Sequence, residues 1–149
     1  MIPNRIVLDT NVCLDLFVFR DPRWAALLAA LKDGTVEAVT RADCRNEWLI
    51  VLGYPHLPLD SESRELAEAE FDQLIRMIEP AAPSAVPLPV CSDTDDQKFL
   101  ELARDACAAG LITKDKALLK LARKTAKAGL FRITPPEAWG NCINPPATS

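Results

Sequence analysis

The stretch Arg5–Val12, RIVLDTNV, places an acid directly after a short apolar run. Residues 6–8 are of the types that form buried strands, whereas Asp9 is followed by the small polar residues Thr10 and Asn11. An unpaired carboxylate is very costly to bury, so an acid at this position needs a partner. The stretch therefore predicts a strand whose carboxyl end carries a polar site.

The composition is that of one globular domain. The chain has 149 residues, of which 49% are hydrophobic and 26% charged, enough for a core of its own. It contains no apolar run of membrane-spanning length and no pattern of a signal peptide, so we expect a cytoplasmic protein without a membrane partner. We expect a single domain over residues 1–140 and a flexible C-terminal tail over residues 141–149.

Several classes of site are excluded by residue counts. The five cysteines are an odd number without a CxxC pair, which favours reduced thiols over disulfides or a zinc site. His56 is the only histidine and lies in a turn-rich stretch, so a Ser-His-Asp triad is not available. The five glycines form neither a Walker A nor a GxGxxG motif, which argues against a nucleotide-binding domain.

Strand and helix patterns alternate along the chain. Short apolar runs predict strands at residues 5–9, 35–40, 111–113 and 130–134. Helical patterns cover residues 12–19, 22–34, 41–53, 61–80, 92–110 and 116–129, with a last helical turn at 135–140. The Pro- and Ala-rich stretch 81–90 has room only for a short strand. This alternation predicts an α/β fold with a mainly parallel sheet and helices on both of its faces.

Acids occur where such a sheet would bind a ligand. Ligands of open parallel sheets lie beyond the carboxyl ends of the strands, and both Asp9 and Asp115 follow predicted strands. Glu47 lies within an otherwise apolar helical stretch, where only a surface or a site would accept it. Taken singly, Glu47 is explained by exposure to solvent and Asp115 by capping of the next helix.

A third group of acids, Asp93, Asp95 and Asp96, begins the helix predicted at 92–110. Capping explains Asp93 or Asp95, because acids in a first turn favour the positive end of the helix dipole. The residues one and two turns beyond Asp96 are all apolar: Phe99, Leu100 and Ala103. This stripe predicts that Asp96 points inward.

Carboxylates that converge at one edge of a sheet repel one another and raise each other's pKa values. A hard divalent cation removes this repulsion, and oxygen ligands select Mg²⁺ or Mn²⁺. Thr10, Asn11 and Thr113 are the small polar neighbours that we expect to orient the carboxylates through hydrogen bonds. The pattern predicts a metal site.

Basic residues gather near the last of these acids, although the net charge is −4. No acid lies between Asp115 and Glu137. Five basic residues there fall at helical intervals, opposite Leu118, Leu121 and Ala122: Lys116, Lys120, Arg123, Lys124 and Lys127. Such a stripe is typical of an ordinary solvated face or of a surface that follows a phosphate backbone, and its lack of balancing acids favours the second.

Four segments in this order resemble the PIN domain family. They are IVLDTNV, NEWLIVL, SDTDDQKFLELA and LITKDKALL, and the resemblance runs from about Arg5 to Ile133. The closest likeness is to the bacterial VapC-type ribonucleases, the toxins of toxin–antitoxin pairs.

The resemblance implies a three-layer α/β/α sandwich that cleaves RNA to products with a 5′-phosphate and a 3′-hydroxyl. The metal ligands that it implies are Asp9, Glu47, Asp96 and Asp115, binding one or two Mg²⁺ or Mn²⁺ ions, with Asp93 as a neighbour of the site. Lys114 occupies a position where relatives often have glycine or arginine, and it joins the basic residues predicted to bind RNA. A cognate antitoxin and homodimerisation are implied in the same way.

Two other classes compete with a nuclease. Phosphatases of the haloacid dehalogenase type also carry an aspartate at the end of the first strand, but their Asp-x-Asp motif is broken here by Asn11. A PIN-like module that binds RNA or a protein without cleavage is the second alternative. Its signature would be a degraded site, whereas all four acids are present.

Overall fold

A computed structural model describes residues 2–79 and 84–143 of the chain. Five strands form one parallel sheet in the order β3-β2-β1-β4-β5. Their bounds are Ile2–Leu8 (β1), Glu37–Thr40 (β2), Ile75–Met77 (β3), Ala108–Ile112 (β4) and Arg132–Thr134 (β5). The predicted α/β fold with a parallel sheet is confirmed.

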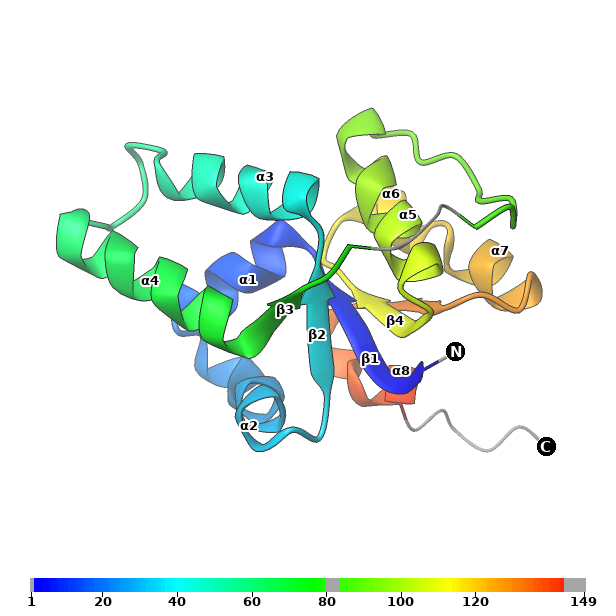
Figure 1. Cartoon of the computed structure of the whole chain (residues 1–149), viewed down its shortest axis with the longest axis horizontal. Coiled ribbons are helices and arrows are strands. Elements are labelled where there is room, and N and C mark those ends of the chain that lie inside the picture. The colour runs from blue at the N-terminus through cyan, green and yellow to red at the C-terminus, as the bar shows by residue number, and fades with distance from the viewer. Residues whose placement is uncertain (1, 80–83, 144–149) are drawn as a thin grey trace.

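Helices cover both faces of the sheet (Figure 1). Their bounds are Thr10–Phe17 (α1), Ala25–Asp33 (α2), Ala42–Leu52 (α3), Ser61–Leu74 (α4), Gln97–Asp105 (α5), Lys116–Leu119 (α6), Ala122–Lys127 (α7) and Gly140–Ile143 (α8). One hydrophobic core lies between the sheet and helices α1 to α4 and α8, and a second lies on the α5 to α7 side. Ile6 and Leu8 enter the first core and Val7 the second, so β1 is buried on both faces.

Strand β3 corrects the prediction of one helix over residues 61–80. Helix α4 ends at Leu74, and residues 75–77 pair in parallel with β2. Ile75 continues the apolar spacing of the helix, so periodicity alone does not reveal the change. Pairing with the edge of β2 makes residues 75–77 a strand, and Ile75 is buried there.

Strand β4 begins earlier than predicted, because the helix expected at 92–110 ends at Asp105. Cys107 takes a left-handed conformation (φ 55°) and turns the chain into the sheet. Gly110 therefore lies within the strand and does not end a helix. A Cβ atom at Gly110 would lie 2.2 Å from Cys142 Sγ, so the missing side chain makes room for α8.

The helix predicted at 116–129 is divided into α6 and α7. The Leu121 N–H donates to the Leu118 carbonyl over 2.9 Å in a tighter turn, and both leucines are buried. Neither proline nor glycine marks this break in the sequence. Helix α8 reaches three residues past the boundary drawn at residue 140, whereas residues 144–149 of the expected tail lie outside the described residues.

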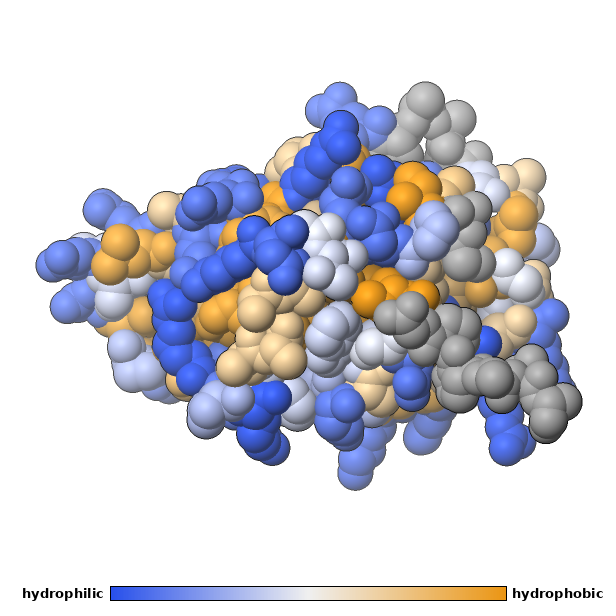
Figure 2. Space-filling view, turned by 90° about the horizontal axis from the view of Figure 1, so that it is seen from below, coloured by the Kyte–Doolittle hydropathy of each residue, from blue (hydrophilic) through white to orange (hydrophobic). Residues whose placement is uncertain are grey.

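The stretch 81–90 forms no strand over residues 84–90, and its first three residues lie outside the described part of the chain. Among the described residues, no helix is long and apolar enough to cross a lipid bilayer. On the face opposite α3, hydrophobic side chains lie in separate areas with hydrophilic ones between them (Figure 2).

Candidate metal centre

The carboxyl ends of β1 and β4 meet at the upper edge of the sheet in Figure 1. Because Leu8 pairs with Ile112, the residues that follow them emerge side by side. The Thr113 hydroxyl donates to Asp9 Oδ2 over 2.6 Å and accepts from the Asp115 N–H over 2.9 Å. One buried threonine thus fixes two acids relative to each other.

Asp9 also begins helix α1. Its Oδ1 accepts from the Thr10 N–H over 2.6 Å, and the residue is only 4% exposed. Helix α1 therefore directs its N-terminal backbone towards the carboxylate, which favours negative charge there. Asn11 follows on the same turn, and its Oδ1 is buried without a hydrogen-bond partner among the described residues.

Asp96 reaches the same point from a third element, the 3₁₀ turn Thr94–Asp96 before α5. Its side chain is buried, as the inward stripe predicts, and its Oδ2 lacks a hydrogen-bond partner within the described structure. Asp93 caps this turn by accepting from the Asp95 N–H over 3.0 Å, and Asp95 is exposed. Oxygen atoms of Asp9, Asp96 and Asp115 all lie within 4.8 Å of one another.

These three aspartates do not ionise alike. Burial raises the pKa of Asp9 to about 6, against the lowering effect of the hydrogen bonds from Thr113 and Thr10. Burial also raises the pKa of Asp96 to about 8, helped by its hydrogen bond with Asp115 and by the charge of Asp9. The same hydrogen bond lowers the pKa of Asp115. Among the described residues, no basic side chain forms an ion pair with any of the three carboxylates.

Glu47 lies on α3 beside this cluster but outside the group of three. Its Oε2 accepts from the Thr10 hydroxyl, and its Oε1 forms an ion pair of 2.8 Å with Lys98 Nζ of α5. Thr10 thus links the two acids, because its N–H bonds to Asp9 and its hydroxyl to Glu47. Both oxygens of Glu47 have protein partners, whereas Asp96 Oδ2 has none among the described residues.

Two further charged residues lie at this edge, Lys98 and Asp15, and the sequence patterns did not predict them as part of the site. Lys114 Nζ pairs with the buried Asp15 over 2.6 Å, and the Trp24 indole N–H donates to the same carboxylate over 3.1 Å. Asp15 is an acid inside an apolar helix, the same signal that singled out Glu47. The ion pair fastens the loop that carries Asp115 to helix α1, so Lys114 has a structural partner.

The remaining basic residues predicted to bind RNA lie on α6, α7 and the turn between them: Lys116, Lys120, Arg123, Lys124 and Lys127. All five are exposed. Within residues 2–79 and 84–143, none of them forms an ion pair with a carboxylate. The division into two helices interrupts the continuous stripe but leaves a positively charged surface next to Asp115.

The donor set of the cluster fits a hard divalent cation. It consists of oxygen atoms alone, it carries excess negative charge, and it includes the unpartnered Asp96 Oδ2. Mg²⁺ and Mn²⁺ prefer such ligands, whereas zinc sites use sulfur and nitrogen. Asp9, Asp96 and Asp115 are the residues that could hold the ion.

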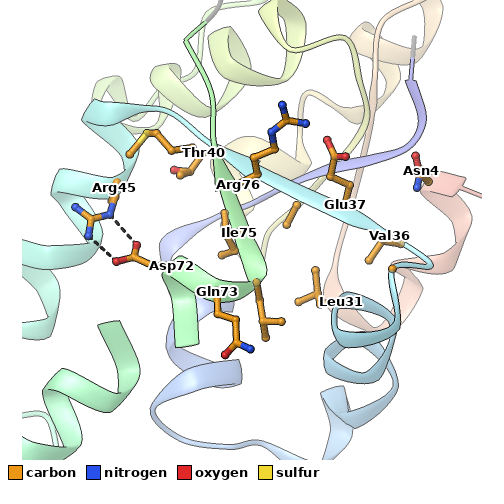
Figure 3. Close-up of a pocket in the computed structure, with 14 residues that line it drawn as sticks. Asn4, Leu31, Val36, Glu37, Thr40, Arg45, Asp72, Gln73, Ile75 and Arg76 are labelled. Carbon is orange, nitrogen blue, oxygen red and sulfur yellow. Dashed lines mark hydrogen bonds and ion pairs between the residues drawn. The ribbon is translucent and has the colours of Figure 1, made fainter. Parts of the chain in front are cut away.

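A surface cavity of about 660 Å³ lies elsewhere, at the β2–β3 edge of the sheet (Figure 3). It is lined by Asn4, Glu37, Gln73 and Arg76 among others and contains none of the four predicted acids. Arg45 and Asp72 at its rim already pair with each other over 2.8 Å. This cavity lacks the convergence of unpaired acids seen at the ends of β1 and β4.

Three aspartates lie together beyond the carboxyl ends of a parallel sheet. The protein is therefore of the α/β class, with an acidic site at one edge of its sheet. The sequence matches the PIN domain family over residues 5–117, so the chain belongs to the PIN domain family, whose members are typically metal-dependent nucleases. No curated protein matches the chain.

We expect the metal-free protein to lose thermal stability as the pH rises. Asp9 and Asp96 bind protons more tightly in the folded chain than at the ordinary pKa of 3.8. Their contribution to the free energy of unfolding is therefore complete below about pH 4, and it is lost as the pH rises through about 6 for Asp9 and about 8 for Asp96. Thermal unfolding in EDTA from about pH 5 to about pH 9 measures this loss.

The Asp96→Asn variant isolates the largest part of that effect. It removes the titrating group with the most raised pKa, so its melting temperature should exceed that of the wild-type protein at about pH 8, with a smaller difference at about pH 5. Parallel pH profiles of the two proteins would contradict this explanation.

Proposed function

We propose that this PIN domain is a metal-dependent endoribonuclease that hydrolyses RNA phosphodiester bonds. Asp9, Asp96 and Asp115 bind Mg²⁺ or Mn²⁺, and Glu47 supports them from α3 as the fourth acid of the site. The observation that carries the proposal is that three aspartates from three separate elements place oxygen atoms within 4.8 Å of one another. The family match over residues 5–117 supports it.

The chemistry assigned to this site needs no histidine. A divalent cation bound there supplies Lewis-acid activation of a phosphate oxygen and of an attacking water. The chain's own residues set the geometry: Thr113 fixes Asp9 relative to Asp115, and Thr10 links Asp9 to Glu47. Products with a 5′-phosphate and a 3′-hydroxyl are the outcome proposed by resemblance.

RNA binding is assigned to the exposed basic residues of α6, α7 and the turn between them. Lys116 directly follows Asp115, and Lys120, Arg123, Lys124 and Lys127 extend the positive surface away from the acids. Exposed lysines and arginines bind phosphates without reading sequence. Lys114 lies at the start of this surface, although its ammonium also pairs with Asp15.

The finer assignment is that of a toxin in a toxin–antitoxin pair, acting as a homodimer and neutralised by a cognate antitoxin. Its support is the resemblance of the four motif segments to VapC-type ribonucleases. Isolation of the tagged chain from its own cells with a tightly bound small protein would support this role. Isolation without any such partner, at natural expression levels, would count against it.

Cleavage of fluorescent single-stranded RNA in Mn²⁺ or Mg²⁺ tests the central proposal. We expect Asp9→Asn and Asp96→Asn each to lower the cleavage rate by at least about 100-fold, since even neighbours of metal ligands contribute about 10–100-fold. The matched control is Asp95→Asn, which removes an adjacent exposed acid and should leave the rate within a few-fold of wild type.

EDTA should abolish cleavage by the wild-type protein. Equal rates for the wild-type and Asp9→Asn proteins would assign the activity to a contaminant. Absence of cleavage over a range of RNAs and metals, with RNA binding retained, would instead favour the non-cleaving module.

The basic surface is tested by the salt dependence of RNA binding. In EDTA, the double variant Lys120→Gln/Lys124→Gln should bind single-stranded RNA more weakly, with a log–log salt slope smaller by about 1.4, or about 0.7 per lost phosphate contact. The control Lys32→Gln/Arg76→Gln removes the same charge from exposed positions on α2 and β3. Equal slopes for the two double variants would show that α6 and α7 do not contact the RNA.

A further inference from the structure

Lys98 is the basic side chain that reaches the acidic edge from α5. It lies two residues beyond Asp96, and its ammonium crosses to Glu47 Oε1 of α3 over 2.8 Å. Both partners are largely shielded from solvent, with 19% of the Lys98 side chain and 26% of the Glu47 side chain exposed. An ion pair in such surroundings is screened far less than one on the surface.

The ammonium group uses two of its three N–H donors within the protein. One donates to Glu47 Oε1 and another to the Asp95 carbonyl. A lysine ammonium carries three donors and no acceptor. The third N–H therefore has no hydrogen-bond acceptor among the described residues, while part of the side chain remains exposed.

The Lys98 ammonium lies directly against a carboxylate in this position. Its Nζ is 2.8 Å from Glu47 Oε1. Glu47 is thereby neutralised by a cation that the chain itself supplies. The three aspartates have no such partner, and Asp96 Oδ2 has none at all among the described residues.

The division of charge at this edge is therefore uneven. One acid is compensated by lysine, and three acids are left for one divalent ion. Two metal ions in a phosphodiesterase share the tasks of activating water and stabilising the leaving oxygen. A lysine ammonium is a compact cation that can contact a phosphate oxygen as a point charge.

We propose that Lys98 replaces a second divalent cation beside Glu47. The site then holds one ion on Asp9, Asp96 and Asp115, and Lys98 donates its third N–H to an oxygen of the substrate phosphate. This inference rests on the proposed function, because it assigns one residue's part in the same site. Lys98 becomes both the counter-cation of Glu47 and a contact for the RNA.

The number of Mn²⁺ ions bound per chain tests this role without an activity assay. Isothermal titration and electron paramagnetic resonance of free Mn²⁺ should both give one ion for the wild-type protein. Lys98→Met leaves Glu47 uncompensated beside Asp9, so this variant should bind two. Lys98→Arg keeps the charge and should bind one.

Two further variants connect the change to Glu47. Adding Glu47→Gln to Lys98→Met should return the count to one, because the uncompensated charge is gone. Lys116→Met removes a lysine next to Asp115 with the same change in net charge, and it should still bind one ion. Two ions bound by Lys116→Met would show that net charge alone sets the count.

The outcomes separate this inference from the proposed function. Absence of Mn²⁺ binding by the wild-type protein, or binding that Asp96→Asn does not weaken, would overturn the metal site itself. One ion in both the wild-type and Lys98→Met proteins, lost in Asp96→Asn, would keep the metal site and overturn the role of Lys98. Two ions bound by the wild-type protein would likewise keep the metal site and overturn the role of Lys98.

Discussion

Parallel pairing of β1 with β4 is the constraint on which the site depends. Asp9 and Thr113 are 104 positions apart in the chain, and the pairing of Leu8 with Ile112 brings their backbones together. The Thr113 hydroxyl then holds the two acids at a fixed distance, because it donates to Asp9 and accepts from the backbone N–H of Asp115. The position of Asp115 thus follows from that of Asp9. Asp96 comes from the turn before α5, which packs on the opposite face of the sheet from α1.

The two cores that stabilise the fold also set the electrostatics of the site. β1 and β4 are covered on both faces, so the acids at their ends are partly removed from water. Burial is the largest cause of the raised pKa values of Asp9 and Asp96. Protons and a cation compete for the same carboxylates, which means that packing and metal affinity are coupled.

Local patterns in the sequence predicted the acids better than the exact elements. Asp9 and Asp115 follow from the rule that parallel sheets bind at their carboxyl ends, and the burial of Asp96 follows from its apolar stripe. β3 was hidden because Ile75 continues the helical spacing of α4, and the start of β4 because Ala-Ala-Gly suits the end of a helix. The partners of Glu47 and Lys114 could not be predicted, since ion pairs between separate elements leave no periodic signal.

The register of β1 also limits how the chain can change in length. Side chains alternate between the two faces, so one residue inserted between Ile6 and Asp9 would exchange the cores that they enter and turn the acid away from β4. The connection between α3 and α4, residues 53–60, lies at the far end of the helical pair in Figure 1, and Glu47 precedes it. Descendants of this sequence can therefore lengthen or shorten that tip while the acids stay in place. The strands cannot change length in this way. Differences in length among related sequences should therefore fall in the connection between α3 and α4 and not in the sheet.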